Sequence, residues 1–425
     1  CKHFQVAQMS DVLEHFDIAQ DLKVEFFLPD AVGNLFILGI SELGSDDVLA
    51  GAGQFIIGVS LLGGTDVLAG DSEIAFTWQG YECSVAEVET SVGGEVQDSL
   101  FFQPRAGQLS VTLQNLLLDP TNNPAFRPGV PVRVRLDRDA VDITLFKGFI
   151  DNMSVGYDVN NQHILQFTAY DSLKQFVNSR LEILDTTDEL EFPDGYATPY
   201  EVIELLAEQF GTSMNALSAQ TRGKLPPMLM TDFIPNTILY DAIQTGLGIF
   251  WVNQETQEFV FIPRPELSDT EGSYSVGNDH NAPLHLCMSD IEVASNIDSI
   301  FNSLQVTLKD DSTTSVLVNN TDSIELYGVF ATDAVVNTTD ATELEDWAEA
   351  VFNSSTRNLV RQVETPAVNR LGNLTHAAVI APGETIRVVY QTSKLNINQA
   401  YTVTKVSHNI NVDNWFTTLE LWKEF

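Results

Sequence analysis

Gly107-Gln-Leu-Ser-Val-Thr-Leu-Gln114 is a stretch in which apolar and polar side chains alternate. Successive side chains of a β-strand point to opposite faces, so a period of two predicts a strand with one buried face and one wet face. Further strands, most of them alternating in the same way between turns rich in Pro, Gly and Asn, are predicted at residues 74–78, 130–136, 144–150 and 162–169. Together they predict an antiparallel barrel or sandwich over residues 71–180.

The pattern changes after Asp171, where helical and strand signals mix. Thr198 precedes Pro199 and a run with helical spacing that stops at Gly211, which are typical N-cap, first-turn and stop signals. Further helices are predicted at 172–180 and 236–245, and a β-hairpin is predicted from 249–252 and 258–262. We therefore predict a small α+β insert domain over residues 181–289.

The last third returns to strand patterns. Strands are predicted at 303–308, 385–390, 399–406 and 415–422, with one helix, 341–359, crossing between them. The simplest architecture is a second β-barrel-like domain over residues 290–425. The predicted fold class is mainly β, with two antiparallel β-barrel-like domains flanking a small α+β domain.

An internal repeat lies near the start of the chain. The segment Phe36-Ile-Leu-Gly-Ile-Ser-Glu-Leu-Gly recurs 19 residues later as Phe55-Ile-Ile-Gly-Val-Ser-Leu-Leu-Gly, and Asp-Val-Leu-Ala-Gly follows in both copies. Each copy predicts a short hairpin, and two copies are too few to bury a core by stacking. We therefore assign residues 1–70 to attachment or to an interface.

The charge of the chain excludes one class of function. The 425 residues hold 59 Asp and Glu against 21 Lys and Arg, a net charge of −38, and no Lys or Arg occurs between Val24 and Pro104. Proteins that hold nucleic acid do so with Lys and Arg on phosphates, so specific DNA or RNA binding is disfavoured. A solvated acidic surface and a surface over which nucleic acid slides without sticking both remain open.

Metal and thiol chemistry find little support in the sequence. The three cysteines, Cys1, Cys83 and Cys287, lie far apart and are expected to be free thiols. Among the histidines at positions 3, 15, 163, 280, 285, 376 and 408, only His280 and His285 have a spacing that resembles metal ligands, and a loop around Pro283 explains them as well. A loose calcium-like spacing at Asp137, Asp139 and Asp142 fits a solvated turn.

Catalytic motifs are likewise missing from the sequence. Carboxylate groups such as Glu201 with Glu204, or Asp188 with Glu189 and Glu191, are expected from the acidic composition alone. No GxSxG or HExxH motif occurs, and the glycines of the repeat do not open a helix after a strand. We predict no enzyme, no cofactor, and no catalytic, cofactor-binding or metal-binding residue.

The order of these features resembles the minor tail proteins, or tail-tip hub proteins, of long-tailed bacteriophages. The resemblance is carried by the repeat at 38–49, by Ala106-Gly-Gln-Leu-Ser-Val-Thr-Leu and the Asp-Pro to Arg-Pro-Gly loop at 119–129, by Leu145-Phe-Lys-Gly-Phe-Ile-Asp151, by Ser323-Ile-Glu-Leu-Tyr-Gly328, and by the strand at 415–422. It covers most of residues 36–425 as an order of features, and the first 35 residues match nothing in the family.

The resemblance implies a structural protein of the virion, at the distal end of the tail and assembled in the cytoplasm of a bacterial host. Two similar barrels per chain let three chains imitate six-fold symmetry, so a homotrimeric ring is expected to join the hexameric tail tube and the distal tail protein to tip or fibre proteins. The tape-measure protein is a further expected neighbour in this baseplate. DNA is expected only as passing, unbound cargo, and no membrane segment is expected because no apolar run reaches ~18 residues.

Two other functions remain open, a receptor-binding or glycan-binding module and a cell-wall hydrolase. In a receptor-binding or glycan-binding module, rings such as Trp78, Trp251, Trp347, Trp415 and Trp422 would form exposed stacking platforms, although core packing is the commoner fate of tryptophan in strand and helix patterns. A cell-wall hydrolase would need convergent carboxylates or a metal in a deep pocket.

Overall fold

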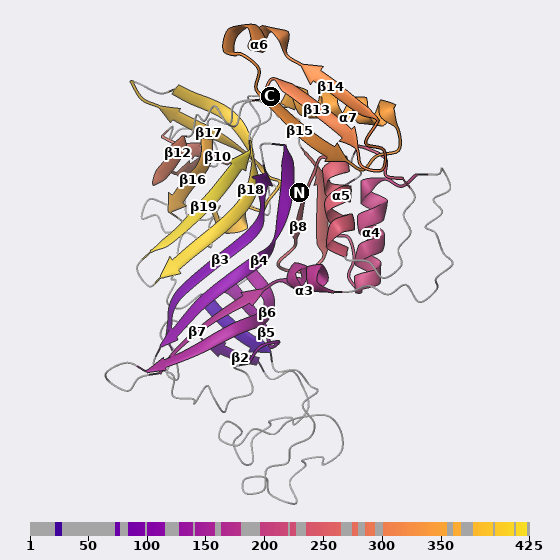
Figure 1. Cartoon of the computed structure of the whole chain (residues 1–425). Coiled ribbons are helices and arrows are strands. Elements are labelled where there is room, and N and C mark those ends of the chain that lie inside the picture. The colour runs from indigo at the N-terminus through magenta and orange to yellow at the C-terminus, as the bar shows by residue number, and fades with distance from the viewer. Residues whose placement is uncertain are drawn as a thin grey trace, which may run out of the picture.

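The structure is a computed structural model that describes residues 22–27, 73–76, 84–97, 100–114, 127–138, 141–157, 163–179, 196–219, 222–226, 235–264, 274–278, 285–293, 301–354, 360–366, 377–393, 396–411 and 414–422. The predicted hairpin repeat of residues 36–70 lies outside them. One long curled sheet forms the body of the molecule, and two helical units stand beside it (Figure 1).

The long sheet contains 14 strands in the described residues, and its main path runs β11-β10-β17-β18-β3-β4-β7-β6-β5-β1-β2. Its amino-terminal strands are β1 (Leu22–Phe27), β2 (Glu73–Phe76), β3 (Ser84–Gln97), β4 (Phe101–Gln114), β5 (Pro131–Arg138), β6 (Val141–Tyr157) and β7 (His163–Tyr170). Its later strands are β10 (Tyr274–Gly277), β11 (His285–Cys287), β12 (Asp290–Val293), β16 (Val360–Pro366), β17 (Thr385–Gln391), β18 (Asn396–Asn411) and β19 (Trp415–Trp422). All pairings are antiparallel except those that β10 makes with β11 and β17.

Two hydrophobic cores lie along this sheet. The first is formed by the inward side chains of β1 and β3–β7, including Phe26, Leu109 and Phe167, all buried. The second is formed by β10, β11 and β16–β19, and includes Tyr401 and Leu419. Burying such a side chain contributes roughly 1.5–3 kcal/mol, so each core helps to hold its half of the sheet together.

The two halves are joined by the pairing of β3 with β18, which runs antiparallel from Lys405 opposite Gly93 to Asn411 opposite Glu87. Strands from the first and last thirds of the chain therefore lie side by side in the middle of the sheet (Figure 1). The sheet does not stop between the two predicted barrel-like domains.

The α+β insert packs against one side of this junction. It contains α3 (Ser172–Asn178), α4 (Pro199–Phe210), α5 (Pro235–Gly246) and the hairpin β8 (Gly248–Val252) and β9 (Phe259–Pro263), which share a core. Thr198 and Glu201 form a capping box at the start of α4, and Gly211, with φ of 83°, ends it. These findings confirm the predicted caps and the predicted hairpin.

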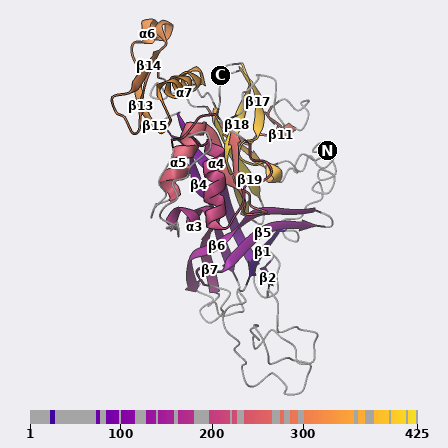
Figure 2. The same ribbon diagram turned by 90° about the vertical axis from the view of Figure 1, so that its right-hand side faces the viewer.

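A second α+β unit projects from the sheet at the end farthest from β2 (Figure 2). Its three-stranded sheet has the order β14-β13-β15. The unit consists of β13 (Ser303–Leu308), β14 (Ser315–Asn319), α6 (Thr321–Tyr327), β15 (Ala331–Val336) and α7 (Ala341–Ser354). The helix predicted to cross between barrel strands instead packs on this small sheet, because the buried side chains Leu344, Trp347 and Val351 face Leu304 and Val306.

The predicted fold class, mainly β with an α+β insert, is confirmed. Strand pairing crosses two of the predicted domain borders. β1, within the predicted segment 1–70, pairs with β5, and β10, within the predicted insert 181–289, pairs with β17. Short strands such as β10 carry no sequence signal for their partner, because pairing over long separations depends on the whole sheet.

Candidate functional site

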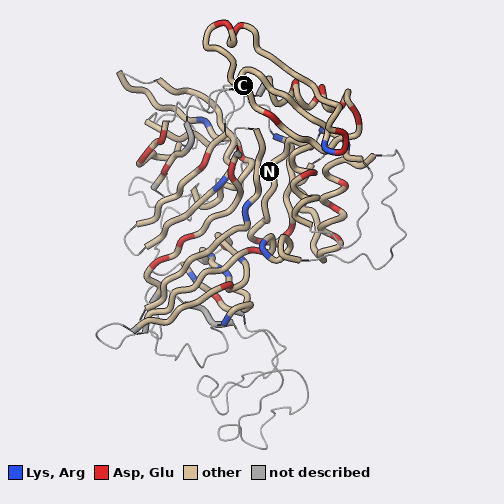
Figure 3. Tube along the Cα trace, in the orientation of Figure 1, with Lys and Arg blue, Asp and Glu red and all other residues tan. Residues whose placement is uncertain are grey.

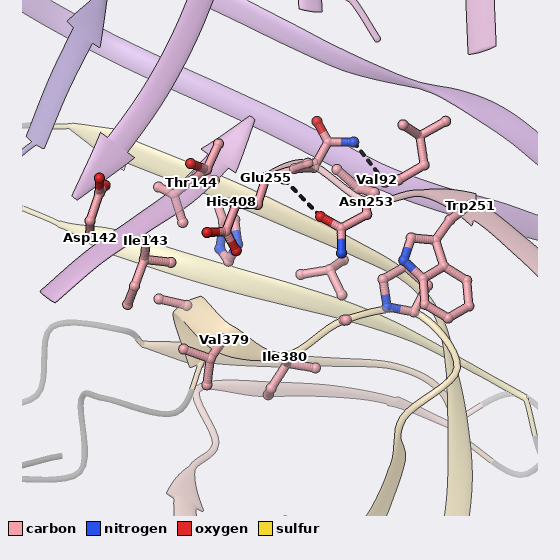
Figure 4. A pocket seen from close by; sticks show the side chains of 17 residues that line it. Val92, Asp142, Ile143, Thr144, Trp251, Asn253, Glu255, Val379, Ile380 and His408 are labelled. Atoms are coloured by element: carbon pink, nitrogen blue, oxygen red, sulfur yellow. Dashed lines mark hydrogen bonds between the residues drawn. The ribbon is translucent and has the colours of Figure 1, made fainter. Parts of the chain in front are cut away.

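The residues around the β3–β18 junction line a cavity and form the candidate site. A cavity of about 250 Å³ lies there, between the long sheet and the insert (Figure 4). Its wall combines apolar side chains, among them Val92, Ile143, Trp251 and Val406, with polar ones from the β8–β9 turn and β18. The first half of the long sheet, its second half and the insert all contribute residues to this cavity.

The β8–β9 turn is held against β6 by side-chain amides. The side chain of Asn253 accepts hydrogen bonds from the backbone N–H of Glu255 and Thr256, which shapes the turn. Gln254 Oε1 then accepts from the Lys147 N–H at 3.1 Å, and Gln257 Nε2 donates to the Lys147 carbonyl at 3.1 Å. This pair of bonds fixes the insert to the first half of the sheet.

Asp171 is a buried carboxyl at the same contact. Its Oδ1 accepts from the Leu173 N–H at 3.1 Å and caps α3, and its Oδ2 accepts from Gln254 Nε2 at 3.3 Å. Burial raises the pKa of Asp171 to about 7, although hydrogen bonds from Gly107, Gln254 and Leu173 lower it in part. The carboxyl is therefore poised between its neutral and charged forms near neutral pH.

His408 lies on β18 beside the cavity and is buried. Trp415 Nε1 donates to His408 Nδ1 at 3.3 Å, and Thr417 Oγ1 lies 2.9 Å from the same nitrogen. An indole N–H can only donate, so Nδ1 is the acceptor and the neutral ring carries its proton on Nε2. Burial lowers the pKa of His408 to about 4, so the ring is neutral at neutral pH, and its Nδ1 already has two polar neighbours in the core.

The opposite face of β3 and β18 is polar. Residues alternate along both strands, so Val92 and Val406 face the cavity while Ser91 and Ser407 face the other way. A groove of about 360 Å³ on this face is lined by Glu89, Ser91, Gln108, Ser110, Lys405, Ser407, Asn409 and Thr418, together with Thr90 and His408. Its charged side chains have partners, since Lys405 Nζ donates to Glu420 at 2.8 Å and the Glu89 carboxylate accepts from the Asn409 amide at 3.0 Å.

A third polar cluster lies at the far end of the first half of the sheet. The carboxylate of Glu25 on β1 is fully buried and accepts from Arg133 at 2.7 Å and from Arg135 at 2.5 Å. Arg135 also contacts Asp142 at 3.1 Å. Sequence reasoning missed this cluster, because nothing near Glu25 indicates that β1 lies beside β5.

The candidate residues singled out from the sequence do not converge. Asp142 pairs with Arg135, Glu201 caps α4, and His285 is buried in β11, whereas His280, Asp139 and the group at 188–191 lie outside the described residues. Across the part of the chain that the structure describes, no group of three or more His, Cys, Asp or Glu side chains could hold a metal ion. Cys287 lies on β11 and is half-buried.

The tryptophans are core residues wherever the structure describes them. The rings of Trp251, Trp347, Trp415 and Trp422 are all buried, and Trp78 lies outside the described residues. The four rings thus form no exposed stacking platform of the kind that a glycan binder needs. Over the described ranges, no helix is both long enough and apolar enough to cross a membrane.

Comparison with solved structures defines the class of fold. The chain is similar to the crystal structure of the 43 kDa tail protein of prophage MuSo2 from Shewanella oneidensis, with 10% identity, a TM-score of 0.54, and coverage of 80% of this chain and 94% of the other. It is similar to the tail protein from Neisseria meningitidis MC58, with 11% identity, a TM-score of 0.54, and coverage of 81% and 97%. The chain therefore has the fold of these two tail proteins.

The family follows from the sequence itself. Residues 99–422, most of the chain, match the model of the YQBQ-like family. The protein belongs to the YQBQ-like family. A search of the curated proteins found no match.

Proposed function

We propose that this protein is a structural hub at the distal end of a bacteriophage tail. Three copies form a ring that joins the six-fold tail tube and the distal tail protein to the tip or fibre proteins, and DNA leaves through the ring. The proposal also holds that the chain is not an enzyme. The tape-measure protein is a further proposed neighbour.

The observation that carries this proposal is the presence of two cores on one continuous sheet. Each half of the sheet curls over its own apolar core, and the β3–β18 pairing holds the halves in a fixed relation. We propose that the two halves present equivalent surfaces, so that three chains place six of them around an axis. The fold shared with two tail proteins supports the same proposal.

The charge supports the proposed path of the DNA. Acidic side chains are spread over the long sheet and both helical units, and basic ones are few (Figure 3). A surface of this sign repels phosphates, so DNA passes without being held. A ring whose lumen proves basic would contradict this part of the proposal.

Oligomer mass and catalytic activity test the proposal on the purified chain. Sedimentation equilibrium should give three times the chain mass of 46.9 kDa, and zymography on peptidoglycan should show no clearing. A chain that stays monomeric at every concentration and in the presence of tail tubes, or that clears peptidoglycan, would contradict the hub. Immunogold label should gather at one end of the tail, and label along its length would also count against it.

A further inference from the structure

The projecting unit that contains β13, β14, β15 and α6 carries most of the exposed large apolar side chains. Of the six found in the described ranges, five belong to this unit. They are Leu317 (60% exposed), Leu326 (75%), Tyr327, Val329 and Val335, which we call the apical patch. Large exposed apolar side chains that gather on one small unit indicate a surface that meets a partner.

One face of the small sheet is open. Helix α7 covers the face that carries Leu304, Val306 and Val336. On the other face, Leu317 of β14 lies in register with Gln305 of β13 and Asp333 of β15, and all three side chains are exposed. The open face is thus continuous from β14 to β15.

The outer edge of β14 has no strand beside it among the residues that the structure describes, because there β14 pairs only with β13. The Asn320 N–H donates to the Asn302 carbonyl and the Leu308 N–H donates to the Thr314 carbonyl, so the even-numbered residues of this stretch bond to β13. In an antiparallel pair the alternate residues turn their N–H and C=O groups outward, which here are those of Ser315, Leu317 and Asn319.

β14 lacks the charged residues, the proline and the bulge that often protect an unpaired edge strand. Its sequence, Ser315-Val-Leu-Val-Asn319, contains no Lys, no Pro and no charge, and its pairing with β13 shows no bulge. Natural proteins use such features to prevent strand addition, so an edge without them is a template for a further strand. The edge of β15 differs, because that side of the sheet faces α5, where Thr245 donates to the Asn337 carbonyl at 2.7 Å.

The acidic charge of the projecting unit favours a basic binding partner. Residues 301–354 hold ten Asp and Glu against one basic residue, Lys309, which is already bonded to Asp241. Asp322 and Glu325 lie on α6, and Asp333 lies on the open face. A second copy of the same surface would bring these carboxylates together, whereas a basic segment would be attracted.

We propose that the free edge of β14 takes up an extended segment of a different tail protein, rich in Lys or Arg with apolar residues between them. The segment adds a fourth strand beside Leu317, and the rest of the apical patch covers its apolar side chains. This inference rests on the proposed tail function, because the partner is another component of the same particle.

Photo-crosslinking inside the particle tests it. Phage is grown in cells that insert p-benzoylphenylalanine at Leu326, or at Leu217 on another unit, which is 48% exposed and serves as the control. After irradiation, the Leu326 particles should give an adduct with a different virion protein through a basic segment, and the Leu217 particles should not. An adduct with a second copy, an adduct within the same chain, or no adduct would overturn the inference.

Matched variants separate strand addition from simple contact. Leu317→Pro removes an outward N–H without touching the bonds to β13, so the adduct should fall at least tenfold, whereas Leu317→Thr keeps the N–H and should retain most of it. The double variant Asp322→Lys and Glu325→Lys should also lower the yield of the adduct. It contains no proline, so it tests the inference even if the proline variant misfolds. An adduct unchanged in Leu317→Pro and in the double variant would overturn the inference.

Immunoblots of the same particles distinguish the two proposals. If the chain is present in particles but gives no partner adduct at Leu326, the strand-addition proposal fails and the tail function stands. If the chain is absent from particles, both fail.

Discussion

The side-chain amide of Asn409 donates a hydrogen bond of 3.0 Å to the carboxylate of Glu89, although the two residues are 320 positions apart in the chain. The bond lies across β18 and β3, at the place where the two halves of the long sheet become one. The continuous sheet forms only when β3, near the start of the chain, pairs with β18, near its end. The stability of the whole molecule should therefore depend on this junction.

Gly93 in the junction should tolerate substitution poorly. It has φ of +119° at an irregularity of β3, and a Cβ there would lie 2.2 Å from the Thr404 carbonyl oxygen. Gly93→Ala should lower the free energy of unfolding by about 2 kcal/mol or more, because strain in the backbone adds to the clash. Gly156→Ala, where the nearest atom is 4.0 Å away, is the control and should change little in urea titration.

Glu25 should be needed for the first half of the sheet. Removing one partner of a buried ion pair leaves uncompensated charge, so Glu25→Gln should cost about 3 kcal/mol in chemical denaturation. The exposed pair of Glu95 and Arg105, at 3.2 Å, provides the control, and Glu95→Gln should cost less than about 1 kcal/mol. Equal costs for the two substitutions would show that the Glu25 cluster is solvated.

Asp171 should make stability fall as the pH rises. Its folded pKa of about 7 lies above the ordinary value of 3.8 for an aspartate, so between these values the folded state holds a proton that the unfolded state has lost. The contribution is complete below about pH 4 and is lost as the pH rises through 7, by at most about 1.4 kcal/mol per pH unit. Asp171→Asn keeps the helix cap, and the stability difference between wild type and variant should shrink or reverse across this window; a constant difference would contradict the buried carboxyl.

His408 should act with the opposite sign. Its folded pKa of about 4 lies below the ordinary value of 6.5 for a histidine, so the unfolded state binds the proton first and stability is lost as the pH falls from 6.5 toward 4. Nitrogen NMR of selectively labelled protein should show a neutral ring, protonated on Nε2, at pH 5.5. A ring that titrates near pH 6.5 would show that the contact with Trp415 is open to water.

Local patterns in the sequence predicted much of the fold, and the unpredicted parts depend on distant partners. Period-two alternation predicted β4, and capping signals predicted α4 with its limits at Thr198 and Gly211. The neighbour of each strand was not predictable, because the alternation in β3 and β18 is the same for any antiparallel partner. For the same reason α7 was assigned to the second barrel, since its apolar face shows that it packs on a sheet but not on which one.

In the candidate site, too, local features were predictable and features made by distant segments were not. The sequence indicated no catalytic constellation, and the described candidates His285, Asp142 and Glu201 lie apart in the fold. It gave no sign that Asp171 is buried or that Glu25 lies between two arginines, because both environments are made by segments remote in the chain. Whether a titratable side chain is buried depends on which distant segments pack against it, and a local sequence pattern does not show this.

Electron cryomicroscopy of the tail tip would show whether three copies of this chain form the hub. We expect a ring of three copies at the distal end of the tail tube, in which the two halves of each long sheet occupy six similar positions around the axis. Density for this chain away from the distal end, or a ring with a number of copies other than three, would contradict it.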